Sequence, residues 1–293
     1  MIVITGANGF IGSELAEVFI KNGKEVVIVD DFTHNNFDLS AKRVDRDDFF
    51  QWFKNNKPLV EIIYHFGAIS DTLSNDEILI KYLNVYYTQN IWHLATEYKV
   101  PLVYASSAAT YGDGGFGYSD NHNDLHKLQP LNFYGWSKHN IDKWVLSQKK
   151  TPLYWAGLKF FNVYGKNEEH KGRMASMVYQ MHKNKLKNTP SNIFKYGEHK
   201  RDFIYVKDII NLSKWILDNG IKSGIYNVGT GIARSFNDIA TILNSQINYV
   251  VMPDNIKKHY QNFTQADITK LRNAGYNESF FTLEEGIKDC YHG

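Results

Sequence analysis

Tyr134 and Lys138 carry a phenol and an ammonium four residues apart, in the run YGWSK. Four residues make about one helical turn, so both side chains lie on one face if the segment is helical. A positive charge beside a phenol stabilises the phenolate, which can exchange a proton with a substrate hydroxyl. Because the chain has 19 tyrosines, an exposed helical pair is the alternative interpretation. The pair indicates acid/base chemistry on an alcohol.

Ser107 strengthens this interpretation. It follows the apolar run LVYA of residues 102–105, which is typical of a buried strand. Ligands of α/β proteins bind at the carboxyl ends of such strands. We therefore expect Ser107 to lie at the ligand-binding edge of a sheet.

Glycines at positions 6, 9 and 12 lie between the β-branched run of residues 2–4 and a helical stretch at 13–20. Glycine lets a strand–helix turn tighten, and its backbone N–H groups can then approach a pyrophosphate at the positive helix N-terminus. An ordinary tight turn is the alternative, but this context favours a dinucleotide site.

Asp30 ends the second strand-like run, about twenty residues further on, where a carboxylate accepts hydrogen bonds from an adenosine ribose. Asp31 adds a second negative charge that would repel a 2′-phosphate, unless it is only a solvated turn residue. We predict that NAD is preferred. NADP stays possible if Lys42 or Arg43, expected further along the same loop, can reach the site.

Strands and helices that alternate along the chain must position these residues. The expected strands are 2–4, 25–30, 62–66, 102–105, 156–161, 202–206 and 224–228, and the expected helices are 13–20, 78–98, 134–147, 175–186 and 208–219. This order predicts an α/β protein: a Rossmann doubly wound parallel sheet with a smaller, discontinuous α/β C-terminal substrate domain.

The composition excludes several other classes. Of 293 residues, 43% are hydrophobic and 22% are charged, and the net charge is +2, which favours neither nucleic acid nor a membrane as partner. The lone cysteine, Cys290, cannot form an internal disulfide. His122 and His126 lack further ligands, so we expect no metal. A cytoplasmic enzyme that forms a homo-oligomer is expected.

Several motifs resemble a known superfamily. TGANGFIG, YASSAATYG and YGWSK are similar to the extended short-chain dehydrogenases/reductases, which include nucleotide-sugar epimerases and dehydratases. FFNVYGKNEEHKGRMASM, KRDFIYVKDI, YNVGTG and YQNFTQADITKLRNAGY resemble the ADP-L-glycero-D-manno-heptose 6-epimerase family. The resemblance covers almost the whole chain, with a contracted stretch near residues 33–48. HKG and FTQAD are its most specific segments.

The resemblance implies an NAD(P)-dependent epimerase of lipopolysaccharide biosynthesis that inverts C6 of an ADP-heptose through a transient ketone. Tyr134 and Lys171 would be the two acid/base residues, because inversion by oxidation and reduction needs a proton partner in both orientations. Lys138 would activate Tyr134 and bind the cofactor ribose, and Ser107 would hydrogen-bond the reacting oxygen.

The resemblance also implies the binding residues. Those for the dinucleotide are Gly6, Gly9, Phe10, Ile11, Gly12, Asp30, Asp31, Phe66, Gly67, Ala68, Ser70, Asn84, Tyr134, Lys138, Val163 and Lys171. Those for the substrate are Ser107, Asn162, Arg173, Gln180, Phe194, Arg201 and Tyr260. Arg173 and Gln180 depart from the family pattern, which has a small hydroxyl residue and a histidine there.

We expect a dinucleotide-binding domain of residues 1–163, to which 202–230 return, and a substrate-binding domain of 164–201 and 231–293. Two alternatives stay open. One is another nucleotide-sugar epimerase or a dehydratase, although the segment after Ser107 lacks the acidic pair of a dehydratase. The other is a dinucleotide-sensing binding protein without catalysis, which would have no need of Ser107, Tyr134, Lys138 and Lys171.

Overall fold

A seven-stranded sheet organises the first part of the computed structural model, which describes residues 1–33, 40–56, 59–72, 74, 76–257 and 260–291. Part of the contracted stretch near residues 33–48 therefore lies outside the described residues. The strands are β1 (Ile2–Thr5), β2 (Val26–Asp30), β3 (Lys42–Asp45), β4 (Ile62–His65), β5 (Leu102–Ser107), β6 (Trp155–Phe160) and β10 (Gly224–Val228).

The strand order is β10-β6-β5-β4-β1-β2-β3, so the chain reverses its direction of growth between β1 and β4. β1 pairs in parallel with β2 on one side and with β4 on the other, with Ile4 opposite both Ile28 and Tyr64. The predicted Rossmann fold is confirmed. In such sheets a crevice opens where the strand order reverses, at the carboxyl ends of the strands.

Helices connect these strands and cover the sheet. They are α1 (Phe10–Lys21), α2 (Phe49–Asn56), α3 (Glu77–Ile80), a π-helical segment η1 (Lys81–Tyr86), α4 (Tyr87–Glu97), α5 (Phe133–Ser147) and α7 (Val206–Asn219). The helix predicted over residues 78–98 is thus confirmed, with a π-helical interruption. The sequence pattern missed β3 and α2.

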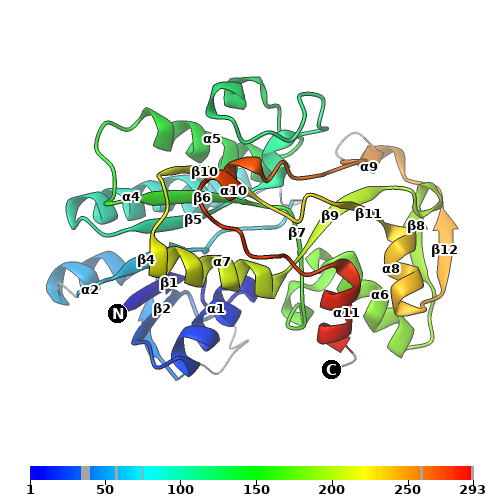
Figure 1. Cartoon of the computed structure of the whole chain (residues 1–293), viewed down its shortest axis with the longest axis horizontal. Helices are drawn as coiled ribbons and strands as arrows, with labels where there is room; N and C mark the ends of the chain where they lie inside the picture. Colours follow the sequence, from blue (N-terminus) through cyan, green and yellow to red (C-terminus); the bar gives the residue numbers. More distant parts are fainter. Residues whose placement is uncertain (34–39, 57–58, 73, 75, 258–259, 292–293) are drawn as a thin grey trace. The chain divides into compact units, whose positions relative to one another are not determined.

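Alternation along β4 separates the two faces of the sheet. The Tyr64 hydroxyl donates to the carbonyl of Ser213 in α7, and its ring lies 5.8 Å from that of Phe19 in α1. Figure 1 draws α1 in blue and α7 in yellow-green on the same side of the strands. The next residue, His65, points to the other face and hydrogen-bonds Thr88 of α4.

Three tryptophans pack together where α4, α5 and β6 meet, one from each element. The ring of Trp92 lies 5.9 Å from Trp144 and 5.3 Å from Trp155, both edge to face. Trp92 is 1% exposed. Aromatic pairs in this geometry add to the stabilisation that burial alone supplies. This cluster therefore holds α4 and α5 against β6.

Shorter elements build the second part of the chain. Its strands are β7 (Asn162–Tyr164), β8 (Ser191–Phe194), β9 (Lys200–Tyr205), β11 (Ala233–Ser235) and β12 (Ile247–Val250). Its helices are α6 (Met177–Leu186), α8 (Phe236–Leu243), α9 (Asp254–Lys257), α10 (Thr269–Asn273), α11 (Leu283–Tyr291) and the 3₁₀ turns η2 (Ala108–Tyr111), η3 (His122–Lys127), η4 (Glu169–Met174) and η5 (Lys195–Gly197). β9 pairs with β7 in parallel and with β11 antiparallel, while β8 pairs with β12.

A buried carboxylate joins three segments of this second part. Asp202 of β9 is fully buried and accepts hydrogen bonds from the backbone N–H groups of Thr230 (2.7 Å), Gly231 (2.9 Å) and Ala266 (3.0 Å). Burial raises the pKa of Asp202, and these donors act in the opposite direction. The motifs KRDFIYVKDI, YNVGTG and FTQAD therefore meet at one side chain.

The chain divides into two compact units. The first comprises residues 1–106, 137–158 and 210–226, and the second comprises 107–136, 159–209 and 227–293. These boundaries differ from the expected 1–163 and 202–230, and which unit binds the substrate stays a prediction. Among the described residues, no helix combines the length and the apolar character needed to cross a membrane.

Trp92→Ala should lower the free energy of unfolding by about 3–5 kcal/mol, because it removes the tryptophan that contacts both others and leaves a cavity. Leu153→Ala is the control, since Leu153 is 64% exposed. Urea unfolding of the three proteins measures the difference. Equal losses in both variants would contradict the importance of the cluster.

Candidate active site

The turn between β1 and α1 requires its glycines for packing. Gly6 has a φ of +71°, and a Cβ there would collide with the backbone of Gly67, which follows β4. A Cβ at Gly12 would collide with the carbonyl oxygen of Gly6. A Cβ at Gly9 would meet only that same oxygen, at 3.2 Å. The two outer glycines thus let backbones pass closely, and Gly9 leaves open the side where a pyrophosphate would approach.

The N-terminus of α1 adjoins this open side. Gly9 is its N-cap, and no side chain caps it, while the predicted residues Phe10 and Ile11 form its first turn. A helix N-terminus of this kind attracts phosphate, because its N–H groups and dipole are positive. The turn therefore fits a dinucleotide pyrophosphate.

Asp30 is held in place at the end of β2. Its carboxylate accepts the backbone N–H of Asn8 (2.8 Å) and that of Asp31 (2.9 Å). Burial raises its pKa, although both N–H donors oppose this shift. The Asn8 bond ties the glycine turn to β2, so the predicted ribose ligand and the phosphate turn form one unit.

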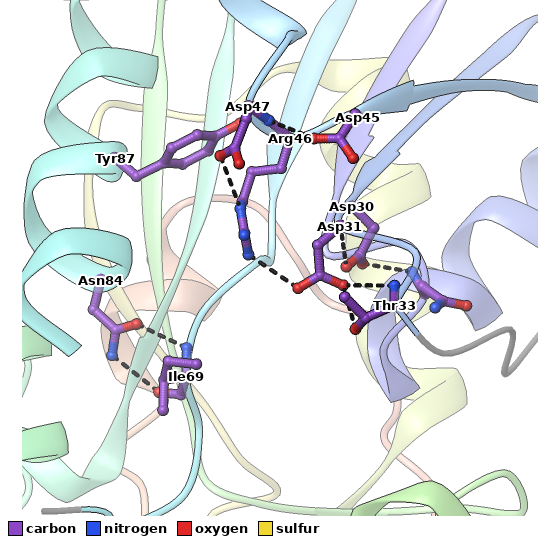
Figure 2. Close-up of polar contacts among 10 residues, drawn as sticks. Asp30, Asp31, Thr33, Asp45, Arg46, Asp47, Ile69, Asn84 and Tyr87 are labelled. Carbon is purple, nitrogen blue, oxygen red and sulfur yellow. Dashed lines mark hydrogen bonds and ion pairs between the residues drawn. The ribbon is translucent and has the colours of Figure 1, made fainter. Parts of the chain in front are cut away.

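Asp31 has a cationic partner that the sequence interpretation missed. Arg46, just beyond β3, places Nη1 3.1 Å from Oδ2 of Asp31 (Figure 2). We expected Lys42 and Arg43 in the same loop as Asp31. In the structure they instead begin β3. The pairing of β2 with β3 could not be read from the local pattern, and this pairing is what brings Arg46 beside Asp31.

Asn84 binds the protein itself at this site. It is fully buried, accepts the N–H of Ile69 (2.8 Å) and donates to the carbonyl of Ile69 and the hydroxyl of Ser137 (Figure 2). It thereby fixes the loop after β4, which carries four predicted cofactor contacts. These are Phe66, Gly67, Ala68 and Ser70.

Lys138 joins α5 to the end of β5. It is 4% exposed, and its ammonium donates to the carbonyl of Ala105 at 2.8 Å. Burial lowers its pKa from 10.5 to about 8, and the nearby Asp142 partly offsets this effect. Asp142 accepts the hydroxyls of Tyr104 (2.9 Å) and Ser106 (2.8 Å). The bond to Ala105 thus fixes the position of the Lys138 ammonium, and burial lowers its pKa.

Ser107 and Tyr134 occupy the second unit. The Ser107 hydroxyl accepts the N–H of Ala109 at 3.1 Å and begins the η2 turn. Tyr134, half-buried, lies in the first turn of α5. Gly135, the next residue, lets α5 pack closely against the η2 turn. A Cβ at Gly135 would lie only 2.9 Å from the carbonyl oxygen of Ala109 in η2. The segment after Ser107 and the first turn of α5 are therefore close neighbours.

Lys171 is paired with a buried carboxylate that the sequence interpretation also missed. Its ammonium lies 2.7 Å from Glu168, which is fully buried. Glu168 also accepts the N–H of Gly165 (3.1 Å) and both the N–H and the hydroxyl of Ser176 (2.7 Å each). Ser176 caps α6, so Glu168 connects the HKG loop to the start of that helix. The acidic residue three positions before Lys171 was the available signal.

Arg173 and Gln180, the two departures, lie near this loop. Arg173 is exposed, after the bend at Gly172, which has a φ of +52°. The Gln180 amide donates to the carbonyl of Ala175 at 2.6 Å. Gln180 thus supports the turn that carries Arg173.

Three predicted substrate contacts come together in the second unit. The rings of Phe194 and Tyr260 lie 5.9 Å apart, and the Arg201 guanidinium lies 5.1 Å from the Tyr260 ring. Arg201 is 6% exposed and donates to the carbonyls of Lys200 and Gln261. Burial lowers its pKa. An aromatic pair with a buried guanidinium suits a base joined to phosphates.

A pocket of about 530 Å³ adjoins this cluster through His199, whose ring lies 4.9 Å from Tyr260. The pocket is lined by Lys195, Tyr196, His199, Tyr249, Val250, Val251, Met252, Lys257 and Asn262. Its size is typical of small-molecule sites. The other predicted contacts, Asn162 and Val163, lie in β7, where Asn162 accepts the Thr264 hydroxyl at 3.4 Å.

Comparisons with known proteins show which family this chain resembles. The model of the NAD dependent epimerase/dehydratase family matches residues 2–229. An ADP-L-glycero-D-manno-heptose-6-epimerase from Fusobacterium nucleatum subsp. nucleatum is 40% identical, over 99% of this chain and 96% of that protein. A protein of the same name from Brachyspira hyodysenteriae is 37% identical, over 98% and 96%.

The crystal structure of the Helicobacter pylori ADP-L-glycero-D-manno-heptose-6-epimerase is also similar. It superimposes with a TM-score of 0.85 at 31% identity, over 99% of this chain and 94% of that one. At this coverage the similarity extends over almost the whole chain.

The stability cost of the buried Lys138 ammonium should depend on pH. The pKa of Lys138 is about 8 in the folded protein and 10.5 in the unfolded chain, so above about pH 8 the folded protein releases this proton while the unfolded chain keeps it. The free energy of unfolding of the wild type should therefore rise with pH above about 8, relative to that of Lys138→Met. The slope should approach about 1 kcal/mol per pH unit. Urea unfolding between about pH 7 and pH 9 measures it. Lys143→Met, at an exposed position of α5, is the control, and a pH-independent Lys138 difference would contradict the prediction.

Proposed function

The chain belongs to the NAD dependent epimerase/dehydratase family, and we propose that it inverts C6 of an ADP-linked glycero-manno-heptose through a transient 6-ketone. The observation that carries this proposal is the full-length similarity to heptose 6-epimerases together with the HKG loop, whose Lys171 is held by a buried carboxylate. The enzyme is an epimerase, and the exact sugar is the proposed part.

The first unit binds the cofactor in this proposal. A bound nicotinamide would supply the hydride transfer of the reaction, by which C6 is oxidised and then reduced from the opposite face. The turn at Gly6, Gly9 and Gly12 receives the pyrophosphate, and Asp30 accepts the ribose hydroxyls. Lys138, one helical turn after Tyr134, donates to the nicotinamide ribose and favours the phenolate form of a neighbouring tyrosine.

Tyr134 and Lys171 exchange the proton of the C6 oxygen. In one C6 configuration Tyr134 removes the hydroxyl proton while the ketone forms, and Ser107 hydrogen-bonds the oxygen. After the ketone presents its other face, Lys171 donates a proton to that oxygen as the new alcohol forms. The reverse reaction uses the same two groups in the opposite roles.

The second unit binds the nucleotide part of the substrate. Arg201 lies close enough to Tyr260 and Phe194 to contact a diphosphate while the rings contact the base. The adjoining pocket offers two lysines, Lys195 and Lys257, beside aromatic and aliphatic side chains. This combination suits an anionic, partly aromatic ligand.

A dehydratase activity is the alternative within the family, but Ala108 and Ala109 stand where a dehydratase carries acidic residues after the serine. A decisive experiment incubates the protein with ADP-D-glycero-D-manno-heptose and follows the C6 configuration by NMR. Unchanged stereochemistry in protein that has bound its cofactor would overturn the substrate assignment and leave the family membership intact.

Tyr134→Phe and Lys171→Met should each lower the epimerisation rate by about 10²–10⁴-fold, the usual contribution of a general acid or base. Dinucleotide affinity should change little. Steady-state kinetics and a dinucleotide titration measure the two quantities. Lys183→Met, at an ion pair of α6 with Glu169, is the control. Near-normal turnover in Lys171→Met would show that one acid/base group suffices.

Arg173→Ser should raise KM about ten- to a hundredfold, because we expect Arg173 to donate a charge-assisted hydrogen bond to the substrate. Its kcat should change less, since the ground state and the transition state share this contact. Kinetics with ADP-heptose and gel filtration test the effect. An unchanged KM with an altered oligomer size would assign Arg173 to a subunit contact instead.

A further inference from the structure

The carboxyl ends of β2 and β3 place charged residues beside the ribose site. The two strands are parallel, and Asp30 is in register with Asp45. Asp31 and Arg46 therefore follow at the same edge, where ligands of such sheets bind. Lys42 and Arg43 begin β3. Lys42 lies over the ring of Trp52 (4.9 Å), and Arg43 lies over the ring of Phe32 (5.5 Å), which directly follows Asp31. The guanidinium of Arg46 contacts Asp31 directly, at 3.1 Å, so we consider Arg46 as the candidate ligand of a 2′ substituent.

Asp31 is fully engaged with its neighbours. One carboxylate oxygen accepts the N–H (3.1 Å) and the hydroxyl (2.9 Å) of Thr33, and the other accepts Arg46. Burial acts to raise the pKa of Asp31, but the bonds from Thr33 and the charge of Arg46 lower it below its ordinary value. Asp31 is therefore a charged group with a defined orientation.

Arg46 has a fixed backbone and a directed side chain. Its N–H donates to the carbonyl of Asp30 (2.8 Å), and its carbonyl accepts the Tyr87 hydroxyl (3.1 Å). Its guanidinium lies between the carboxylates of Asp31 and Asp47, the latter at 3.5 Å (Figure 2). The side chain is 26% exposed, so it can exchange one anionic partner for another.

We propose that Asp31 and Arg46 together decide whether the site accepts a 2′-phosphate: Asp31 holds the guanidinium of Arg46 and so withholds it from the ligand. This inference rests on the dinucleotide site of the proposed function and on the preference for NAD that the sequence predicts there. With Asp31 charged, a 2′-phosphate meets a carboxylate and an arginine that is already paired. Without that charge, Arg46 becomes available, and its planar donors match a phosphate well.

The proposal differs from simple repulsion by Asp31 in one measurable respect. If repulsion alone excluded NADP, removing the charge of Asp31 would improve NADP binding whether or not Arg46 were present. If Arg46 becomes the phosphate ligand, the improvement requires it. A double-mutant cycle separates the two.

The experiment titrates the full-length protein, freed of bound dinucleotide, with NADH and NADPH and follows the nicotinamide fluorescence. In Asp31→Asn we expect NADPH to bind about ten- to a hundredfold more tightly, the usual effect of a charge-assisted hydrogen bond, while NADH affinity changes little. Asparagine keeps an acceptor for Thr33, so the loop is preserved. In Asp31→Asn/Arg46→Gln most of this gain should disappear.

Asp31→Asn/Lys42→Gln is the matched control and should keep the gain, because Lys42 lies at the far end of β3. The proposal would be overturned if the gain in NADPH affinity persisted in Asp31→Asn/Arg46→Gln. It would also be overturned if that gain disappeared in Asp31→Asn/Lys42→Gln. Thermal unfolding of each variant shows whether the fold is intact. Failure of the wild type to bind NADH would instead contradict the dinucleotide site of the proposed function.

Discussion

The close approach of Gly6 to Gly67 is the constraint on which the cofactor half of the molecule depends. The strand order reverses between β1 and β4, and the backbones that leave these two strands pass too closely for any side chain at Gly6. Because both turns are compact, α1 begins immediately beside the sheet, and its N-terminus points to the crevice where an anion is stabilised. Asp30 then accepts the N–H of Asn8 in the same turn, so the predicted phosphate and ribose sites share one support.

Three of the cations predicted to act at the site are held by other groups of the protein. Lys138 donates to a carbonyl of β5, Lys171 is paired with Glu168, and Arg201 donates to two backbone carbonyls. A buried ammonium or guanidinium without such partners would be costly. These partners keep the cations oriented, and an oriented group loses less conformational freedom when it binds a ligand.

Asp202 has the corresponding role in the second unit. It receives hydrogen bonds from residues 28 to 64 positions further along the chain, and it thereby links the strand that carries Arg201 to the segments that follow Tyr226 and Phe263. The motifs KRDFIYVKDI, YNVGTG and FTQAD therefore also have a structural role, because they are joined to one another through Asp202. Replacing Gly229 would disturb the same junction, since a Cβ there would lie 2.7 Å from the carboxylate of Asp202.

The sequence by itself determined the features that depend on local patterns. Buried runs predicted the strands of the central sheet except β3, and the glycine spacing predicted the turn at Gly6. The four-residue spacing placed Tyr134 and Lys138 on one helix, α5. Tertiary structure alone decided which cation meets Asp31, because Arg46 reaches it only through the pairing of β2 with β3. It also decided that Glu168 is buried beneath Lys171, since its burial depends on packing against Ser176 and not on the polar character of the loop. Local periodicity reports which face of an element is apolar, whereas the partner of a charge depends on which distant strands lie side by side.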